Sequence, residues 1–328
     1  MEKILQVKNL KVEFKFAKGK KLNAVNNLDL DIKKGEVVGL VGESGSGKSM
    51  TALSIMRLVP YPGKIKNGEI YINKINKNLL QISEKKMVDI RGKLVSMIFQ
   101  DPLSSLNPCF RIGWHLKEVV RSNDNKLNKK ERKDIIIDTL KKVRFNNVDQ
   151  LLEKYPHELS GGMRQRVTIA MAIIMNRGLV LADEPTTALD VTTQDEIFNL
   201  IEEIREKYGI SFLIISHNLY LVGERCDRMY VIYAGQIVEE GEPIDIFENP
   251  LHPYTKCLIK SIPKLEVYNQ DLYTIRGELI DLMNLPEKGC FFRDRCDYSE
   301  EICSEIIPDI KKISEKRFVR CHMYFNYE

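Results

Sequence analysis

Residues 37–49 read VVGLVGESGSGKS, an apolar run followed at once by a glycine-rich loop. The run has the composition of a buried parallel strand, and residues 49–58 have the spacing of a helix. The loop matches G-x-x-x-x-G-K-[ST] between a strand and a helix, which is the context that this motif requires. This order predicts an α/β fold built around a phosphate-binding loop. The residues expected to contact a nucleotide here are Gly42, Glu43, Ser44, Gly45, Ser46, Gly47, Lys48 and Ser49.

Each residue type in this loop has a chemical role. Glycines let the backbone curl so that several N–H groups point at a phosphate, and the following helix adds its N-terminal dipole. Lys48 is expected to contact the β- and γ-phosphates, and the Ser49 hydroxyl is expected to bind Mg²⁺. A glycine turn that only connects strand to helix does not explain Lys48 and Ser49 together. We therefore predict nucleotide binding.

A second apolar run, residues 179–182, ends in the acidic pair Asp183 and Glu184. Ligand crevices of parallel sheets open at the carboxyl ends of strands, where this pair is expected to lie. Asp183 is predicted to hold Mg²⁺ through its water shell, and Glu184 to act as general base on the water that attacks the γ-phosphate. Asp-Glu-Pro is also a good turn sequence, so a surface turn is the alternative. The phosphate loop upstream favours catalysis.

The 328 residues suffice for one large and one small domain. Broken alternation over residues 5–32 predicts antiparallel strands at the start, and the Lys-rich residues 101–165 predict a helical subdomain. A predicted helix at 193–208 and a buried strand at 212–215 resume the α/β core. A turn-rich segment near residue 250 divides the chain into a domain of residues 1–250 and a C-terminal extension of residues 251–328.

Composition excludes several classes of protein. The apolar fraction of 43% and the charged fraction of 29% are those of a globular protein. The net charge is +4 and the basic residues are scattered, which gives little support to nucleic-acid binding. The N-terminus lacks a secretory signal, and no apolar stretch approaches the roughly 20 residues of a spanning helix. Membrane association is therefore expected to go through a partner.

Residues 159–166, LSGGMRQR, lie just before the acidic pair and resemble the signature motif of ABC ATPases. Ser160 and the Gly161 and Gly162 amides at a helix N-terminus form a second anion site in this interpretation. The alternative is an ordinary helix cap with Ser160 as N-cap. Three further residues resemble the Q-loop, D-loop and H-loop of the family, in its order: Gln100, Asp190 after Ala188-Leu189, and His217.

The resemblance implies a P-loop NTPase ABC cassette: a RecA-like core with an antiparallel β subdomain and a helical subdomain, followed by a small C-terminal extension. It implies that Gln100 contacts Mg²⁺ and the attacking water, that His217 holds the γ-phosphate, and that Asp190 organises a dimer contact. Phe14 is the best match to the aromatic that stacks on adenine, with Phe16 as runner-up, although either is equally suited to a strand core. Two cassettes would face head to tail, so a second copy or a sister ATP-binding subunit is required.

Three segments indicate one branch of the ABC family. Residues 42–49, 99–108 and 252–255 resemble the ATP-binding subunits of oligopeptide and dipeptide importers. The resemblance implies an ATPase on the cytoplasmic face of the cell membrane that energises peptide uptake. Its partners would be two transmembrane permease subunits and an extracytoplasmic peptide-binding protein, without nucleic acid. Nickel and metallophore importers share the branch. A soluble ABC ATPase is a further alternative, but two cassettes or a coiled-coil insertion, usual in such proteins, are not visible.

Four of the seven cysteines form a group in the extension with spacing C-x5-C-x6-C-x17-C. In a reducing compartment, grouped thiols indicate metal ligands rather than disulfides. Ligand rules alone leave an iron–sulfur cluster, Zn²⁺ or no metal open, and His322 is a competing ligand. Resemblance to dipeptide-importer subunits with this pattern favours a [4Fe–4S] cluster in a structural or sensing role. The expected ligands are Cys290, Cys296, Cys303 and Cys321.

Overall fold

The computed structural model describes residues 2–16, 19–75, 77–175, 177–187, 189–262 and 273–325. The chain divides into two compact units. The first comprises Met1–Leu5, Ile32–Val37 and Ile72–Ile215, and the second comprises Gln6–Asp31, Val38–Tyr71 and Ser216–Glu328. The two units are therefore interleaved along the sequence.

The first unit contains a parallel sheet in the order β7-β6-β5. Every residue of β6 and β7 is buried. Parallel strands covered on both faces need continuous apolar runs, which explains the lack of polar alternation in these segments. The register pairs Asp183, the last residue of β6, with Ile215 of β7. The strands are β5 (Val95–Ile98), β6 (Leu179–Asp183) and β7 (Ser211–Ser216).

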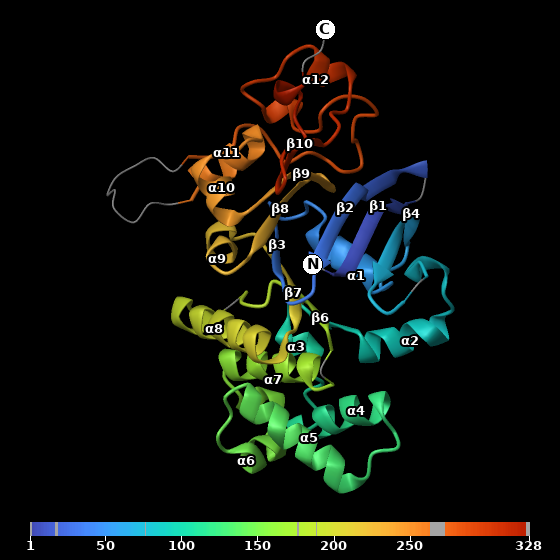
Figure 1. The fold of residues 1–328 in the computed structure, drawn as a ribbon, viewed down its shortest axis with the longest axis vertical. Helices are drawn as coiled ribbons and strands as arrows, with labels where there is room; N and C mark the ends of the chain where they lie inside the picture. Colours follow the sequence, from blue (N-terminus) through green and yellow to red (C-terminus); the bar gives the residue numbers. More distant parts are fainter. Residues whose placement is uncertain are drawn as a thin grey trace. The chain divides into compact units, whose positions relative to one another are not determined.

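Helices fill most of the first unit between β5 and β6 (Figure 1). In α4, Ile112, Leu116 and Val120 recur every four residues and are fully buried, as expected of the inner face of an amphipathic helix. Helix α5 begins with a capping box in which Asn128 and Glu131 each accept the other's backbone N–H. The helices are α2 (Glu84–Lys93), α3 (Pro102–Ser105), α4 (Ile112–Asn123), α5 (Lys129–Lys142), α6 (Val148–Glu153), α7 (Gly161–Ile173) and α8 (Val191–Tyr208), with 3-10 turns at Leu79–Gln81 and Pro156–Glu158.

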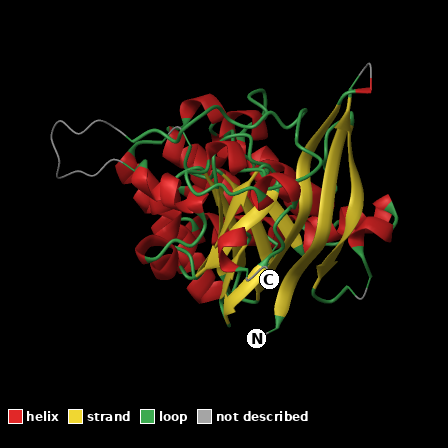
Figure 2. Ribbon diagram, turned by 90° about the horizontal axis from the view of Figure 1, so that it is seen from above, coloured by secondary structure: helices red, strands yellow, loops and turns green. Residues whose placement is uncertain are grey.

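The second unit contains a three-stranded sheet in the order β2-β1-β4, whose long strands lie side by side in Figure 2. In β1 the buried residue that follows Val7 is Leu10, three positions later instead of two. Asn9 lies in this interval with a left-handed backbone, φ +47°, which interrupts the two-residue period of an ideal strand. The broken alternation in the sequence therefore has a local backbone cause. The strands are β1 (Lys3–Lys15), β2 (Lys21–Lys33) and β4 (Gly63–Ile72).

A further set of paired strands in this unit, part of an eight-stranded sheet in the order β10-β11-β9-β8-β3-β7-β6-β5, joins the C-terminal extension to the rest of the unit. Strand β3 pairs parallel with β8, and β8-β9, β9-β11 and β11-β10 pair antiparallel (Figure 1). The pairing of β11 with β9 attaches the extension through backbone hydrogen bonds. The strands are β3 (Val37–Val41), β8 (Arg228–Tyr233), β9 (Gln236–Gly241), β10 (Lys311–Ser314) and β11 (Arg317–Val319). The helices are α1 (Lys48–Ile55), α9 (Leu219–Gly223), α10 (Pro243–Glu248), α11 (Pro253–Lys260) and α12 (Ile302–Glu305), with 3-10 turns at Arg293–Arg295 and His322–Tyr324.

A buried ion pair reinforces this junction. The Glu239 carboxylate is fully buried and accepts hydrogen bonds from Arg317 Nη2 at 2.6 Å and from the Leu251 and His252 backbone N–H groups at 2.7 and 2.9 Å. Gly241 is required beside it, because a Cβ there would lie 2.3 Å from Arg317 Nη1. Burial raises the pKa of Glu239, against the opposing effect of its hydrogen bonds. The pair needs both partners, since either charge alone would be costly to bury.

The predicted elements are present, and their boundaries differ from the expected ones by one to three residues. The sequence predicts a helix over residues 49–58, whereas α1 ends at Ile55. Arg57 has a left-handed backbone, φ +53°, so the chain leaves the helix before Pro60. Helix α8 ends as expected at Tyr208, where Gly209 adopts the left-handed C-cap conformation with φ +64°. None of the described helices is long and apolar enough to cross a membrane.

Replacing Arg317 with Met tests the buried ion pair. We expect the free energy of opening at the Leu251 and His252 amides to fall by about 3 kcal/mol, because Glu239 loses its countercharge while buried. Native-state hydrogen exchange measures this directly. The control is Lys316→Met, which breaks an exposed pair with Glu242 and should leave this free energy almost unchanged, because solvent screens the pair. Equal, small losses in both variants would contradict the role given to the pair.

Candidate functional site

The phosphate loop lies between β3 and α1 in the second unit. Lys48 is buried at the first position of α1, and its Nζ donates to the Gly42 and Glu43 carbonyl oxygens at 2.8 Å each. The loop backbone therefore curls around the lysine side chain. The Ser49 hydroxyl follows in the first turn of α1, and Ser44 and Gly45 are exposed at the tip.

Two glycines in this loop have no substitute. Gly47 has φ +105°, and a Cβ on it would lie 2.4 Å from the Ala24 carbonyl oxygen. A Cβ on Gly42 would lie 2.3 Å from the Ile232 carbonyl oxygen. Side chains at either position would push the loop away from the strands that support it. A further support is the hydrogen bond from the Gly235 N–H to the Ser46 carbonyl oxygen, at 2.8 Å.

The acidic pair ends β6 in the first unit. Asp183 is buried within the sheet, and Glu184 follows with φ +47°, a left-handed conformation that is uncommon outside glycine. The Glu184 N–H donates to the Ile215 carbonyl oxygen at 2.9 Å, which fixes this conformation. Residues held in such sparsely populated conformations concentrate at active sites. Because a tight turn also adopts this conformation, the catalytic role of Glu184 stays a prediction.

Two side chains hold the Glu184 carboxylate. Gln100 Nε2 and Thr187 Oγ1 both donate to its Oε2, at 3.0 and 2.8 Å. Gln100 lies 84 residues upstream of Glu184, and the structure brings these two predicted site residues together. Sequence reasoning did not identify Thr187, because Asp-Glu-Pro-Thr-Thr carries no signal that one of its two threonines turns back to the carboxylate.

The signature segment begins α7. Ser160 is the N-cap, and its Oγ accepts the Met163 N–H at 3.3 Å. Gly161 and Gly162 occupy the first turn, and a Cβ on Gly162 would lie 2.7 Å from Thr193 Cγ2. Within one chain, Ser160 therefore serves as a helix cap, and Gly162 permits close packing against the start of α8. Ser160 is exposed, and its contribution to a second anion site stays a prediction.

Asp190 and His217 follow two different strands of the first unit's sheet. Asp190 is exposed and caps α8: its carboxylate accepts the Thr193 N–H at 2.9 Å and Oγ1 at 2.8 Å, which lowers the pKa of Asp190. Ala188, expected beside it in the D-loop, lies outside the described residues. His217 follows β7 and is exposed, and the next residue, Asn218, caps α9.

Two aromatic residues at the end of β1 differ in their surroundings. Phe14 is partly buried and packs near Gly63, where an added Cβ would lie 2.7 Å from the Phe14 ring. Phe16 is 40% exposed, immediately after the strand. The edge of the Phe14 ring therefore lies close to Gly63. Phe14 stays the predicted adenine-stacking residue, with Phe16 as runner-up.

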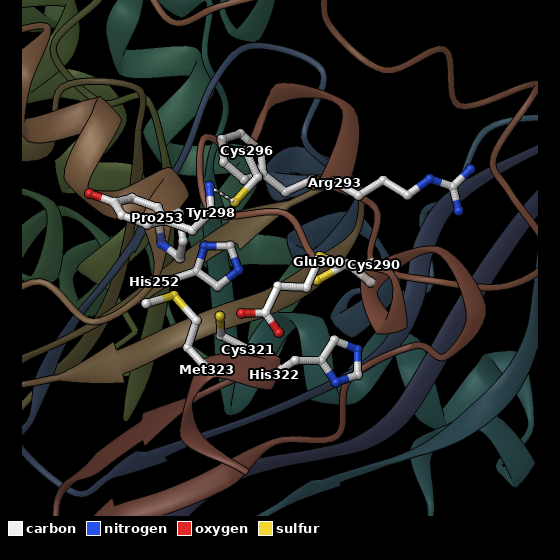
Figure 3. A pocket seen from close by; sticks show the side chains of 12 residues that line it. His252, Pro253, Cys290, Arg293, Cys296, Tyr298, Glu300, Cys321, His322 and Met323 are labelled. Carbon is white, nitrogen blue, oxygen red and sulfur yellow. Dashed lines mark hydrogen bonds between the residues drawn. The ribbon is translucent and has the colours of Figure 1, made fainter. Parts of the chain in front are cut away.

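The four cysteines of the extension line one pocket (Figure 3). Cys290 and Cys296 flank a short loop, Cys303 belongs to α12, and Cys321 follows β11. Figure 3 shows the Cys290, Cys296 and Cys321 side chains around this pocket together with His252, Glu300 and His322. The Nε2 atom of His322 lies 2.8 Å from the Ile306 carbonyl oxygen, so that ring nitrogen is already engaged.

Burial and mutual proximity shape the chemistry of these thiols. Burial, followed by the effect of the other three thiols, raises the pKa of Cys290 to about 12. Burial likewise raises the pKa of Cys321 to about 11 and raises that of Cys296. Within the described ranges, no group of three or more His, Cys, Asp or Glu side chains is arranged to hold a metal ion.

Glu43, within the phosphate loop, makes two contacts that the sequence did not indicate. Its carboxylate accepts two hydrogen bonds from Arg295, at 2.9 and 3.1 Å, and its N–H donates to Tyr254 Oη at 2.9 Å. Arg295 and Glu43 are 252 residues apart. No periodicity or motif relates positions so far apart, so these contacts required the structure.

Comparisons with known proteins agree with this geometry. Residues 25–187 match the family model "ABC transporter", and residues 238–303 match "Oligopeptide/dipeptide transporter, C-terminal region". The oligopeptide transport ATP-binding protein AppD of Bacillus subtilis (strain 168) is 44% identical over 99% of this chain and 98% of its own length. The dipeptide transport ATP-binding protein DppD of Haemophilus influenzae is 41% identical over 98% of this chain and 96% of its own length.

A solved structure shares the fold. The dimeric ATP-binding cassette MJ0796, in a post-hydrolysis state with bound ADP and Pi, has a TM-score of 0.64 and 27% identity. The match covers 73% of this chain and 98% of that cassette. With relatives above 40% identity over nearly their whole length, this chain belongs to the family of ABC transporter ATP-binding proteins and carries the C-terminal region of its oligopeptide/dipeptide branch.

Proposed function

We propose that this chain is the ATP-hydrolysing subunit of an importer that takes up di- and oligopeptides. The observation that carries the proposal is similarity over almost the full chain, C-terminal region included, to proteins named for oligopeptide and dipeptide transport. The retained phosphate loop, acidic pair and signature segment support an active enzyme. A regulatory subunit without activity would be expected to lose Glu184 or the signature glycines.

ATP binding rests on the phosphate loop. Lys48 exchanges its two carbonyl contacts for β- and γ-phosphate oxygens when the nucleotide enters, and the amides at the exposed tip of the loop bind the same phosphates. Phe14 stacks on adenine, with Phe16, whose ring is 40% exposed and therefore accessible, as the alternative.

Hydrolysis rests on the acidic pair. Ser49, Gln100 and Asp183 hold Mg²⁺, which neutralises charge on the β- and γ-phosphates. Glu184 polarises the attacking water, and its hydrogen bonds from Gln100 and Thr187 support this role by orienting the carboxylate before substrate arrives. His217 holds the γ-phosphate in the transition state.

The signature residues act in a dimer. The γ-phosphate bound by one cassette is contacted by Ser160, Gly161 and Gly162 of the other cassette. Asp190 organises the contact between the two cassettes. The second cassette is a further copy of this chain or a sister subunit.

Two transmembrane permeases and an extracytoplasmic peptide-binding protein complete the importer, and the chain binds them at the cytoplasmic face of the membrane. Closing and reopening of the dimer converts ATP hydrolysis into permease movement.

A second candidate within the branch is import of nickel or a metallophore. The ATP site is the same in both cases, so only the transported substrate separates them. A soluble ABC ATPase is disfavoured by the C-terminal region, which matches a transporter family model over residues 238–303.

The cysteine pocket is proposed to hold an iron–sulfur cluster. Four thiols lining one pocket supply the donor set of a [4Fe–4S] cluster, and each thiolate binds a separate iron. A single Zn²⁺ would instead need sulfur atoms within about 3.8 Å of one another, since Zn–S bonds are about 2.3 Å. Zn²⁺ is the alternative occupant, and the metal content of the purified protein distinguishes the two. When bound, the cluster would cross-link the extension and supply a one-electron redox centre.

Uptake of labelled di- and oligopeptides tests the proposed substrate. Cells without this chain are expected to lose peptide uptake, and the wild-type gene is expected to restore it. Glu184→Gln should not restore uptake, because the water lacks its base. The control Glu203→Gln, an exposed carboxylate paired with Arg144, should restore it fully.

Two outcomes would contradict the peptide assignment. Loss of nickel uptake with peptide uptake unchanged would move the substrate to the metal branch and leave the ATPase assignment intact. Unchanged uptake of both would favour an ABC ATPase without a permease.

Replacing Cys296 with Ser tests the proposed cluster. The purified variant is expected to lose its bound iron and any brown colour, because serine is a poor ligand for iron–sulfur centres. ATP binding should persist, because serine is similar in size and leaves the phosphate loop unchanged. The control is Cys109→Ser, an exposed thiol outside the pocket, which should keep its iron. Stoichiometric iron in the Cys296 variant, or zinc without iron in the wild type, would overturn the cluster.

A further inference from the structure

The phosphate loop contains a carboxylate, Glu43, although its ligand is an anion. The structure neutralises this charge: the Arg295 guanidinium donates to both carboxylate oxygens, at 2.9 and 3.1 Å. The Arg295 side chain is 6% exposed and that of Glu43 is 22% exposed, so solvent screens this pair only weakly. Forked contacts of this kind are the strongest that arginine makes.

Glu43 also anchors the loop backbone. Its carbonyl oxygen accepts Lys48 Nζ at 2.8 Å, and its N–H donates to Tyr254 Oη at 2.9 Å. The residue is therefore held by the extension through its side chain and its N–H, while its carbonyl holds the phosphate-binding lysine.

Arg295 and Tyr254 are fixed by a common aromatic cluster. The Phe292 ring lies 5.4 Å from the Tyr254 ring and 5.2 Å from the Tyr233 ring, and Arg295 Cζ lies 5.9 Å from the Phe292 ring centre. Arg295 Nε also donates to the Arg276 carbonyl oxygen at 3.0 Å. The guanidinium thus reaches Glu43 from a rigid support within the cysteine-bearing loop.

We propose that Arg295 is a positioning residue for ATP binding: it neutralises Glu43 and, with Tyr254, fixes the backbone that presents Lys48. The C-terminal extension thereby sets the nucleotide affinity of the cassette. Without Arg295, the Glu43 carboxylate repels the incoming phosphates, and the Glu43 segment is free to move. This inference rests on the proposed ATP binding, and it adds a residue from outside the nucleotide-binding motifs.

Equilibrium binding of a fluorescent ATP analogue with Mg²⁺ to the purified full-length chain tests the proposal. Arg295→Gln is expected to raise Kd about tenfold, within the usual range of such couplings. Glu43→Gln is expected to bind ATP more tightly than Arg295→Gln does, because it leaves no uncompensated carboxylate in the loop. The double variant should return to within about threefold of wild type, because it no longer carries an uncompensated carboxylate. The control Arg276→Gln removes an exposed arginine of the same extension and should bind normally.

The double variant separates charge neutralisation from a merely structural role. If it binds ATP as weakly as Arg295→Gln, Arg295 acts only through packing and the proposal is overturned. An unchanged Kd in Arg295→Gln overturns it as well. If that variant does not fold, Arg295→Lys replaces it: the expected rise in Kd is smaller and is again removed by Glu43→Gln, and persistence of the rise contradicts the proposal.

Hydrogen exchange supplies a reciprocal readout. Because binding linkage is mutual, ATP should slow exchange at the amides of residues 290–296 in the wild type and should not do so in Arg295→Gln. Absence of protection in a wild-type chain that binds ATP overturns this inference alone. A wild-type chain that binds no ATP overturns the proposed function.

Discussion

The fold depends on a loop of backbone N–H groups that must remain open to an anion. Such a loop cannot be stabilised by burying it, so its neighbours hold it from outside. Gly42 and Gly47 lie against carbonyl groups of other strands, Gly235 bonds to the loop backbone, and Lys48 bonds to two loop carbonyls. The loop is therefore preorganised for phosphate, with its binding groups exposed and its supporting groups buried.

The C-terminal extension takes part in this support. It joins the sheet that begins with β3 through the β9-β11 pairing, and it is held there by the buried Glu239–Arg317 pair. Within the same unit, Arg295 contacts the phosphate loop itself. A buried ion pair adds little net stability, but it excludes arrangements in which its partners are separated. Two such pairs give the extension a defined position relative to the nucleotide loop.

Local signals in the sequence predicted most of the fold and the placement of the phosphate loop between a strand and a helix. Buried strands, the glycine loop and the position of Glu184 at a strand end follow from patterns within a few residues of one another. The predicted proximity of Gln100 and Glu184 needed the family resemblance. The contacts of Glu43 with Arg295 were not predictable, because a single charged residue in a long extension gives no indication of its partner. The resemblance favoured Phe14 over Phe16 for adenine stacking, and this choice stays a prediction because no local pattern distinguishes the two rings.

The most direct test of this account is the behaviour of purified Glu184→Gln with Mg-ATP, followed by ATP turnover and by light scattering. The account predicts that ATP still binds, that turnover falls at least about a hundredfold because the water lacks its base, and that the variant accumulates as an ATP-bound dimer. Undiminished turnover would show that Glu184 is not the base. A variant that binds ATP, does not turn it over and stays monomeric would contradict the shared site between two cassettes.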